Sequence, residues 1–485
     1  MPNLVSIMWF RQDLRVANNP AFVAAVESGR PVVPLFIWHA GKRKSWAPGT
    51  ASRWWLVKSL ENLASELAKL SSRLIVREGE PHMVLDQLTK EIQVNSVFWN
   101  RRYEPSEKRI ESRVNKLIRR AGMEIQVFNS NLLFDPDEIK TGKDEPYKVF
   151  TPFWNACLSL PSPIGPLPAP RRIQNPEKWP ASESLDELGI SLQLNSNKGR
   201  FEEWNPGTLS AQRQMDRWIS RFMHNYSQER DRPDHDTTSR LSPHLHFGEI
   251  SPHQIWHAVK SRISKAGPKS ARISAEAFLR QIGWREFAYY LLHHYSNTVD
   301  EPMRPEFDHF PWHRDIRALK SWKNGSTGYP IVDAGMRQLA ESGWIHNRVR
   351  MIVASFLVKH LLIPWQEGAK WFWENLVDAD LASNTLGWQW VAGCGADAAP
   401  YFRVFNPVLQ GEKFDPDGKY VRKWIPEIAS IPNQWVHKPW QAPPTLLSRS
   451  GVRLGKDYPR PIVDHSSARR RALDAYDAMR KHRRS

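Results

Sequence analysis

Residues 343–365 read GWIHNRVRMIVASFLVKHLLIPW, residues 371–393 read WFWENLVDADLASNTLGWQWVAG, and residues 399–407 read APYFRVFNP. In the first string, apolar side chains from Ile345 to Leu357 recur at intervals of three and four, which is the period of a buried helix. The same strings place charged and amide side chains among the apolar and aromatic ones, and buried charges are tolerated only when they are paired or bound to something polar. We therefore expect a polar cavity with aromatic walls between helices, the kind of site that cofactors occupy.

The length and charge of the chain limit the possible classes of protein. At 485 residues it exceeds what one hydrophobic core usually serves, so we expect two domains. Lys plus Arg exceed Asp plus Glu by 68 − 51, which gives a net charge of +17. This excess favours polyanionic partners, nucleic acid first and acidic membrane surfaces second, although a basic protein without such a partner has the same composition.

Cysteine usage and hydropathy point to a cytoplasmic protein. Cys157 and Cys394 are the only cysteines and form no CxxC motif, which argues against a disulfide scaffold, structural zinc and an iron–sulfur cluster, so we expect no metal. No apolar run reaches the roughly 18 residues that cross a bilayer, and the first strand-like segment follows no signal peptide. We expect no membrane partner, no obligate protein partner and a monomer.

The N-terminal part alternates strand-like and helix-like segments. Short apolar or β-branched runs occupy residues 4–10, 32–38, 73–79, 94–100 and 124–129, and helical patterns such as 51–70 and 106–120 separate them. This alternation predicts an α/β domain with a doubly wound parallel sheet over residues 1–130. The loop after the first run, RQDLRVANN, lacks the glycines of a dinucleotide-binding site, so we exclude that function for the domain.

The composition changes after residue 130. Prolines crowd residues 161–170, and residues 131–200 are predicted to be an interdomain linker. From 201 to 485 helical periods dominate, which predicts an all-α domain. Its basic, helix-like tail at 466–485 is interpreted as a solvated face, with contact to nucleic-acid phosphates as the alternative.

Specific strings identify a family. They are WFRQDLR (9–15), TTSRLSPHLHFGEIS (237–251), FLRQIGWREF (278–287), TGYPIVDAGMRQL (327–339), GWIHNRVRMIVASFLVK (343–359), DADLASNTLGWQW (378–390), DAAPYFRVFNP (397–407) and GEKFD (411–415). In this order they resemble the photolyase/cryptochrome family over nearly the full chain, most closely the class I DNA photolyases that act on cyclobutane pyrimidine dimers. The resemblance implies an α/β antenna domain followed by an all-helical FAD-binding catalytic domain.

The resemblance also implies where FAD binds. The hydroxyls and amides of residues 237–242 would hold its pyrophosphate, whereas local rules alone favour a helix N-cap at Ser242. Arg350 and Asp378 would pair beside the isoalloxazine ring, with Asp380 accepting from its N3–H. The full set of implied FAD-binding residues is Tyr226, Thr238, Ser239, Arg240, Leu241, Ser242, Gln281, Arg285, Asn347, Arg350, Asp378, Asp380 and Asn384.

Asn384 is the implied neighbour of flavin N5. A neutral amide can hydrogen-bond N5 without repelling the anionic reduced flavin, whereas an aspartate would repel it. Photolyase-like members of the family carry Asn here, so this position predicts a reduced, electron-donating flavin. The alternative is that Asn384 caps the following helix.

Tryptophans are assigned two roles by the resemblance. A dimer flipped out of the duplex needs aromatic faces to stack on, and Trp284 and Trp390 match the two tryptophans that supply them. The implied DNA-binding residues are Trp284, Arg285, Arg348, Met351, Trp390, Arg403 and Gln410. Trp388, Trp365 and Trp312 match a chain that carries electrons to the flavin, although three unrelated core aromatics would look the same in the sequence.

One position departs from the class I pattern. In those enzymes a Glu that hydrogen-bonds the dimer precedes Trp-Arg, and here that residue is Gln281. An amide donates only a neutral hydrogen bond, which is about half as strong as a charge-assisted one. We therefore predict dimer repair with lowered efficiency, in which Gln281 and Asn347 are catalytic residues and UV-damaged DNA is the partner.

Two other functions within the family compete with this prediction. A cryptochrome-like photoreceptor without repair activity is the alternative that Gln281 favours. A (6-4) photolyase is less well supported, because those members carry His-His where this chain has His346-Asn347.

A second, antenna chromophore is implied in the N-terminal domain. Folate-binding members carry an Asn–Glu pair where this chain has Ser106 and Glu107, so folate is disfavoured. A deazaflavin, another flavin and an empty pocket stay open. Glu107 is alternatively an ordinary exposed carboxylate in the first turn of a helix.

Overall fold

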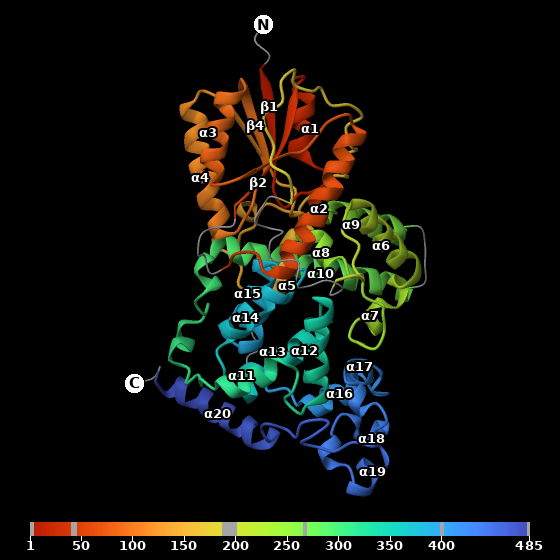
Figure 1. Ribbon diagram of the computed structural model, residues 1–485. Helices are drawn as coiled ribbons and strands as arrows, with labels where there is room; N and C mark the ends of the chain where they lie inside the picture. Colours follow the sequence, from red (N-terminus) through yellow and green to blue (C-terminus); the bar gives the residue numbers. More distant parts are fainter. Residues whose placement is uncertain (1–3, 40–45, 187–200, 265–268, 398–401, 483–485) are drawn as a thin grey trace. The chain divides into compact units, whose positions relative to one another are not determined.

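A computed structural model of the chain describes residues 4–39, 46–186, 201–264, 269–397 and 402–482. The chain divides into two compact units (Figure 1). The first unit comprises Met1–Asn225, Ser239–Ser296 and Val377–Ala382. The second unit comprises Tyr226–Thr238, Asn297–Leu376 and Ser383–Ser485.

The first unit contains a parallel five-stranded sheet in the order β3-β2-β1-β4-β5. Its strands are β1 (Val5–Phe10), β2 (Val32–Trp38), β3 (Ile75–Glu78), β4 (Val94–Asn100) and β5 (Glu124–Phe128). All residues of β1 and β2 are buried, which explains why these strands read as continuous apolar runs. The strand order reverses between β1 and β4, at the carboxyl ends of which α/β proteins usually bind their ligands.

Helices cover both faces of the sheet. They are α1 (Pro20–Glu27), α2 (Thr50–Lys69), α3 (Pro81–Glu91) and α4 (Pro105–Arg120). Figure 1 shows α3 and α4 on one side and α1 on the other. Ile110, Val114 and Ile118 recur every four residues along α4 and pack into the core under this face, together with apolar residues of α3.

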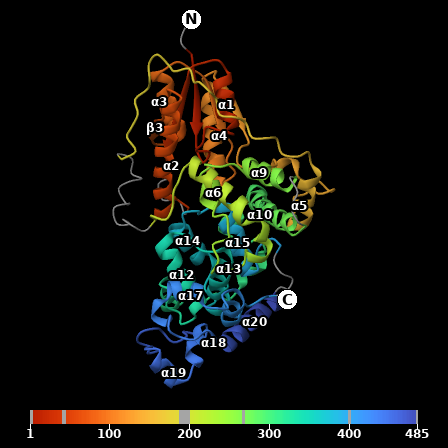
Figure 2. The ribbon, with the colours of Figure 1, turned by 90° about the vertical axis from the view of Figure 1, so that its right-hand side faces the viewer.

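The rest of the first unit is helical. It contains α5 (Phe150–Ser159), α6 (Thr208–Arg221), α8 (Ser242–His246), α9 (Pro252–Ser264) and α10 (Lys269–His294), with short 3₁₀ turns at Pro136–Glu138 and Met223–Asn225. Figure 2 shows α5 and α9 beside α10. Helix α5 lies inside the segment expected to be a linker, and it is amphipathic enough to bury Phe150, Phe153 and Trp154.

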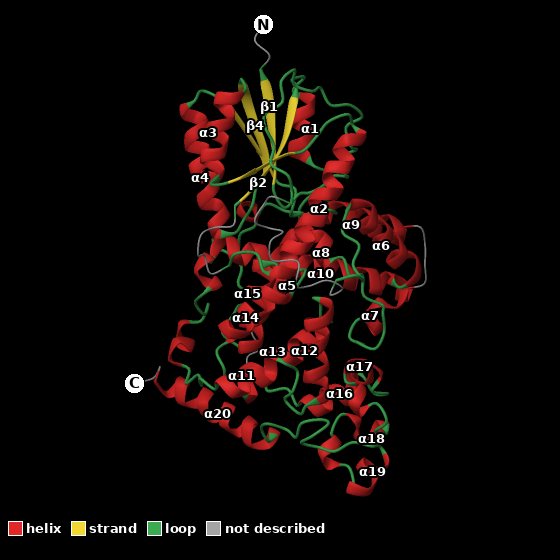
Figure 3. Ribbon diagram, in the orientation of Figure 1, coloured by secondary structure: helices red, strands yellow, loops and turns green. Residues whose placement is uncertain are grey.

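The second unit is built from helices and loops (Figure 3). Its helices are α7 (Tyr226–Glu229), α11 (Ile316–Lys323), α12 (Pro330–Ser342), α13 (Asn347–Ser355), α14 (Trp365–Asn375), most of α15 (Leu381–Ala392), α16 (Pro407–Phe414), α17 (Lys419–Trp424), α18 (Asn433–Val436), α19 (Pro444–Arg449) and α20 (His465–His482). Short 3₁₀ helices occupy Ser296–Val299, Pro305–His309, Pro426–Ile428 and Pro439–Gln441. Helix α13 continues into a π-helix, Phe356–His360, in which every residue is buried.

The predicted fold class, α/β followed by all-α, is confirmed. The predicted strands overlap all five observed strands, and the observed helices α2 and α4 each begin one residue before the predicted ones. The tail is more than a solvated face: Ala468, Ala472 and Met479 of α20 are buried, and Arg471 donates to the backbone oxygen of His360. Residues 483–485 of the tail lie outside the described residues.

Candidate functional site

A buried carboxylate, Asp380, stands immediately before α15 in the first unit. It accepts a hydrogen bond from the hydroxyl of Tyr289 on α10, and its Oδ2 lies 3.4 Å from Nδ1 of His246 on α8. Burial opposes ionisation of Asp380, but His246, Arg285 and Tyr289 outweigh it and hold its pKa well below the ordinary value. Asp380 is therefore a charged acceptor that rigid helices hold in place.

The last residue of the segment 237–242, Ser242, contacts Asp378, two residues before Asp380. The Ser242 hydroxyl donates to the Asp378 carboxylate at 2.6 Å. Residue Leu241, rather than Ser242, occupies the N-cap position of α8, so the helix-cap interpretation of Ser242 is wrong. Arg240 adopts a left-handed backbone with φ of 50°, which turns the chain sharply before α8.

Three predicted site residues lie within one turn of α10, in the middle of the helix. Gln281 donates from Nε2 to the backbone oxygen of Ala277 at 3.2 Å. The Trp284 ring stacks on Phe150 of α5 with centroids 3.8 Å apart and planes within 8°. Arg285 is largely buried, donates to the backbone oxygen of Asn131 at 2.6 Å and lies over the Tyr289 ring. Trp284 is thereby fixed as a flat platform, and Arg285 contributes its charge from inside the unit.

In the second unit, Asn347, Arg348, Arg350 and Met351 lie on the first turns of α13. Arg348 forms an ion pair with Asp231 at 2.6 Å and stacks on Phe414. Arg350 donates from Nε to the backbone oxygen of Ile345 at 2.8 Å. Asn347 is exposed, and Arg350 and Met351 are half-buried.

His346 caps α13 and has an unsatisfied nitrogen. Its Nδ1 accepts from the backbone N–H of Arg348, which leaves Nε2 as the protonated nitrogen. Nε2 is buried without a hydrogen-bond partner among the described residues. Desolvation lowers the pKa of His346 to about 4, so the ring is neutral at physiological pH and presents one unused N–H donor.

Asn384 lies in the first turn of α15, four residues after Asp380. Its Nδ2 donates to the backbone oxygen of Ala369 on α14 at 3.1 Å, which fixes the orientation of the amide. Because Nδ2 faces this carbonyl, the other amide atoms are held in a defined direction. Tyr226 is buried against Arg230, and Thr238, Ser239 and Leu241 complete the predicted FAD-binding set.

The three tryptophans of the predicted electron chain differ in exposure. Trp388 and Trp365 are 2% and 1% exposed, and Trp312 is half-buried beside Phe310. Trp388 is packed directly on Gly368 of α14, where a Cβ atom would lie 2.0 Å from its ring. Trp312 is therefore the least buried of the three, as the outer end of a route to the surface requires.

The remaining predicted DNA-binding residues follow α15. Trp390 is half-buried and donates from Nε1 to the backbone oxygen of Asp397 at 3.1 Å. Arg403 is exposed and lies over the Phe405 ring, and Gln410 is half-buried on α16. Residues 398–401 of the family string DAAPYFRVFNP lie outside the described residues.

The crevice at the strand switch point is filled by ion pairs. Arg11, directly after β1, contacts Glu107 and Glu111 of α4. Burial opposes ionisation of Glu107, but Arg102 and Arg11 outweigh it and lower its pKa to about 2. Glu107 is therefore not the exposed first-turn carboxylate that the sequence allowed.

A separate cavity of about 540 Å³ runs along α4 in the first unit. Basic side chains dominate its lining, including Arg101, Lys108, Lys116 and Arg119. Its volume lies within the range of about 300–1,000 Å³ that is typical of small-molecule sites.

Sequence reasoning missed residues that hold the predicted ones. His246 and Tyr289 position Asp380, and Trp322 packs edge-to-face on Trp388 with centroids 6.2 Å apart. His246 and Tyr289 lie 134 and 91 residues from Asp380, so no local spacing signals the contact. Within the described residues, no cluster of His, Cys, Asp and Glu could hold a metal ion. None of the described helices meets the length and hydropathy of a membrane span.

Comparisons with known proteins show which family the chain resembles. Residues 6–171 match the family model of DNA photolyase, and residues 278–478 match the model of the FAD binding domain of DNA photolyase. The deoxyribodipyrimidine photo-lyase of Agrobacterium fabrum is 46% identical over 98% of this chain and 98% of its own. Cryptochrome-1 of Arabidopsis thaliana is 38% identical over 98% of this chain and 70% of its own.

A solved structure corrects the expected subclass. The crystal structure of a bacterial class III photolyase from Agrobacterium tumefaciens superimposes with a TM-score of 0.93 and 45% identity, over 99% of this chain and 98% of that one. The expectation that the chain is most similar to class I enzymes was therefore wrong. Full-length matches at this identity show that the chain belongs to the photolyase/cryptochrome family and contains its FAD-binding domain.

Proposed function

We propose that this chain is a light-dependent DNA repair lyase that splits cyclobutane pyrimidine dimers. The observation that carries the proposal is the ionised, buried carboxylate of Asp380, directly followed by α15 with its oriented amide at Asn384. A charged acceptor and a neutral amide, one helical turn apart, suit the edge of a reduced flavin. The photolyases that match over the full chain support light-dependent DNA repair as the activity.

The donor set fits FAD. Asp380 is ionised and can accept an N–H hydrogen bond, and Asp378 is oriented by Ser242. In the second unit we assign Arg350, Asn384 and Tyr226 to the same cofactor. His346, which caps α13, has an N–H group without a hydrogen-bond partner among the described residues and could donate to it. Bound FAD, when reduced and excited by light, supplies the electron that a dimer needs to split.

Residues of the chain would tune the cofactor's charge environment and carry electrons to it. Asn384 offers an uncharged hydrogen bond and therefore does not repel a negatively charged cofactor, as a carboxylate would. Trp388, Trp365 and Trp312 are the proposed route by which electrons enter, and of these three only Trp312 is half-buried rather than fully buried. Gly368 keeps Trp388 against α14, the helix that begins at Trp365.

Recognition of damaged DNA is assigned to aromatic platforms and cations. Trp284 is held flat by Phe150, and stacking on a flipped base contributes about 1–3 kcal/mol per base. Trp390 is the second proposed platform. The rest of the proposed DNA-binding set is Arg285, Arg348, Met351, Arg403 and Gln410, with the guanidinium of exposed Arg403 available for phosphate.

The alternative is a photoreceptor of the cryptochrome type. Gln281 favours it, because its amide replaces the acid of class I repair enzymes and already donates to Ala277. The similarity to a plant cryptochrome is compatible with it. The two functions separate in one assay, since only a lyase removes dimers from DNA in the light and leaves them in the dark.

We place any second chromophore in the α/β domain. The switch-point crevice is occupied by Arg11 and its two carboxylate partners, whereas the 540 Å³ cavity along α4 is lined by basic groups that suit an anionic chromophore. Loading the protein with folate, deazaflavin and FMN in turn, and searching for energy transfer to FAD, identifies the occupant. Substitution of Lys108 and Arg119 by Gln should weaken that transfer.

A further inference from the structure

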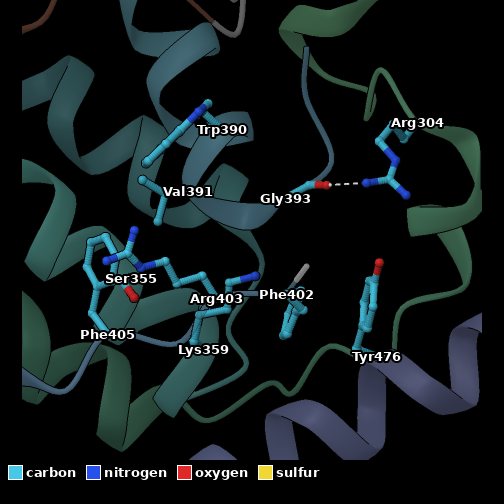
Figure 4. A pocket seen from close by; sticks show the side chains of 10 residues that line it. All are labelled: Arg304, Ser355, Lys359, Trp390, Val391, Gly393, Phe402, Arg403, Phe405 and Tyr476. Atoms are coloured by element: carbon cyan, nitrogen blue, oxygen red, sulfur yellow. Dashed lines mark hydrogen bonds between the residues drawn. The ribbon is translucent and has the colours of Figure 1, made fainter. Parts of the chain in front are cut away.

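A second polar cavity lies within the second unit, beside the π-helix (Figure 4). It measures about 50 Å³ and is lined by Arg304, Ser355, Lys359, Trp390, Val391, Gly393, Phe402, Arg403, Phe405 and Tyr476. No Asp or Glu is among these lining residues. Trp390 and Arg403 also belong to the proposed DNA-binding set, whereas Lys359 and Ser355 have no part in the functions proposed above.

Lys359 is the group that sets the character of this cavity. It is 2% exposed and comes from the fourth position of the π-helix. Its Nζ donates to the backbone oxygen of Ala392 at 2.7 Å and lies 3.0 Å from the centre of the Phe402 ring. An ammonium group has three donors, so one protein acceptor leaves two of them for something else.

Burying a cation without an anion is expensive. The described residues place no carboxylate within ion-pair distance of Lys359, and desolvation lowers its pKa well below the ordinary value. The effective penalty of a buried charge is several kcal/mol, and a methionine would fill the same space without it. π-Helical turns are also rare, and they frequently lie at functional sites. Both features indicate that Lys359 is retained for a ligand.

Other groups in the cavity are complementary to an anion. The Ser355 hydroxyl is buried without a hydrogen-bond partner among the described residues, although it can donate. Arg403 is exposed and has no carboxylate partner in the part of the chain that the structure describes. Arg304 is already committed to Glu306 at 2.8 Å and to the backbone oxygen of Gly393 at 3.1 Å. The groups of this cavity that have no partner among the described residues are therefore hydrogen-bond donors and positive charges, which suit an anion.

The size of the cavity limits which ligands can bind in it. One water needs about 10–15 Å³ of such a volume, so the cavity has room for several non-hydrogen atoms but not for a nucleobase. We propose that this cavity binds a phosphate-type oxoanion, held by Lys359, Ser355 and Arg403. Stacked Phe402 and Tyr476, with centroids 4.5 Å apart, wall it on the apolar side and strengthen the electrostatic attraction by excluding water.

Two sources could supply the same oxoanion: free inorganic phosphate and a phosphate of the DNA backbone. The second source rests on the proposed function, and the first does not. The experiment therefore has two arms, both with the full-length protein. In the first, inorganic phosphate is titrated at low ionic strength and followed by the ³¹P line width and the unfolding temperature. In the second, binding of undamaged duplex is measured as a function of salt.

Lys359→Met is compared with Lys320→Met, which removes an exposed lysine from α11 of the same unit. We expect Lys359→Met to weaken phosphate binding at least tenfold while Lys320→Met leaves it unchanged. Ser355→Ala and Arg403→Gln should each weaken binding severalfold, and they test the site even if Lys359→Met does not fold. If backbone phosphate enters, Lys359→Met also reduces the slope of log affinity against log salt by about one.

The possible outcomes distinguish free phosphate from DNA phosphate, and they test the anion site separately from the proposed repair function. Loss of phosphate binding with an unchanged salt slope assigns the cavity to free anion, and a reduced slope assigns it to DNA. The inference is overturned if Lys359→Met and Lys320→Met behave alike in both arms and Ser355→Ala also leaves phosphate binding unchanged. That result would leave the repair function untouched, because Lys359 and Ser355 play no part in it.

Discussion

The hydroxyl of Tyr289 donates a hydrogen bond to the carboxylate of Asp380, and both side chains are buried in the first unit. This contact joins the C-terminal third of α10 to the start of α15. It fixes the position of Asp380 and favours its ionised form.

Tyr289→Phe should therefore weaken FAD binding. A hydrogen bond to a charged group contributes about 1.5–3 kcal/mol, which corresponds to roughly a tenfold or greater rise in the dissociation constant for FAD. Fluorescence of released FAD measures the constant. Tyr290→Phe is the control, because its hydroxyl bonds to the backbone at Ile139 and Tyr147 instead. Equal FAD affinity in the two variants would contradict the role assigned to Tyr289.

The acid stability of the protein should also depend on this pair. Because the folded-state pKa of Asp380 is lowered, its stabilisation is present above the ordinary carboxylate pKa of about 4 and is lost as the pH falls below that value. Tyr289→Phe raises the folded-state pKa and so reduces the loss. Urea unfolding at pH 7 and pH 3 should show a smaller difference for the variant than for the wild type.

Glu286 should produce the opposite dependence on pH. Desolvation raises its pKa from 4.5 to about 7, although Arg285 and the backbone N–H groups of Leu133 and Phe134 oppose the shift. The folded state then holds a proton that the unfolded state has released, so stability falls as the pH rises from 4.5 to about 7. The total fall is on the order of 3 kcal/mol for one such group.

Glu286→Gln should remove this fall, since the amide oxygen still accepts from the backbone and cannot titrate. Glu276→Gln is the matched control on the same helix, where the carboxylate is exposed and paired with Arg272. The free energy of unfolding between pH 5 and pH 8 is the measurement. A slope in Glu286→Gln equal to that of the control would show that Glu286 is ionised at neutral pH.

Gly368→Ala should disturb the electron route. The added Cβ would lie 2.0 Å from the Trp388 ring, so the ring must move, and such overpacking costs about 1–3 kcal/mol. We expect slower light-driven reduction of bound flavin. Gly387→Ala is the control beside Trp388, because its Cβ meets nothing within 4 Å and should stabilise α15 by about 0.5–1 kcal/mol. Unchanged photoreduction in Gly368→Ala would place the route elsewhere.

Gln281→Glu should raise the repair yield severalfold. The amide now donates to Ala277, and a carboxylic acid would instead supply a stronger hydrogen bond to the dimer. Gln281→Leu, which offers no hydrogen bond, should lower the yield below that of the wild type. Quantum yields with a dimer-containing oligonucleotide measure both. Equal yields for Glu and Gln would mean that the amide does not limit repair.

The sequence predicts helices and strands well where their buried residues recur at a regular spacing. All residues of β1 are buried, and the run LVSIMWF therefore has the appearance of a central strand. The helical period from Ile345 to Leu357 is likewise correct. The period does not reveal that the helix widens into a π-helix at Phe356, because one inserted residue per turn barely changes the spacing of apolar side chains.

The sequence proposes candidate site residues but does not reveal the residues that contact them. Motif strings locate Asp380 and Ser242, yet the contacts of Asp380 with His246 and Tyr289 bridge 134 and 91 residues. Helix α5 was missed because prolines follow it closely and its ten residues hold fewer than three helical periods. Tertiary packing supplies the information that these local patterns lack.

The most direct test is illumination of the purified, FAD-loaded protein with an oligonucleotide that carries one thymine dimer, under reducing conditions. Chromatography of the digested product measures how many thymines are restored. The proposed function predicts restoration that requires light and exceeds one turnover per protein. Dimers that persist in the light, while the protein holds FAD and binds the oligonucleotide, would contradict it and favour the photoreceptor.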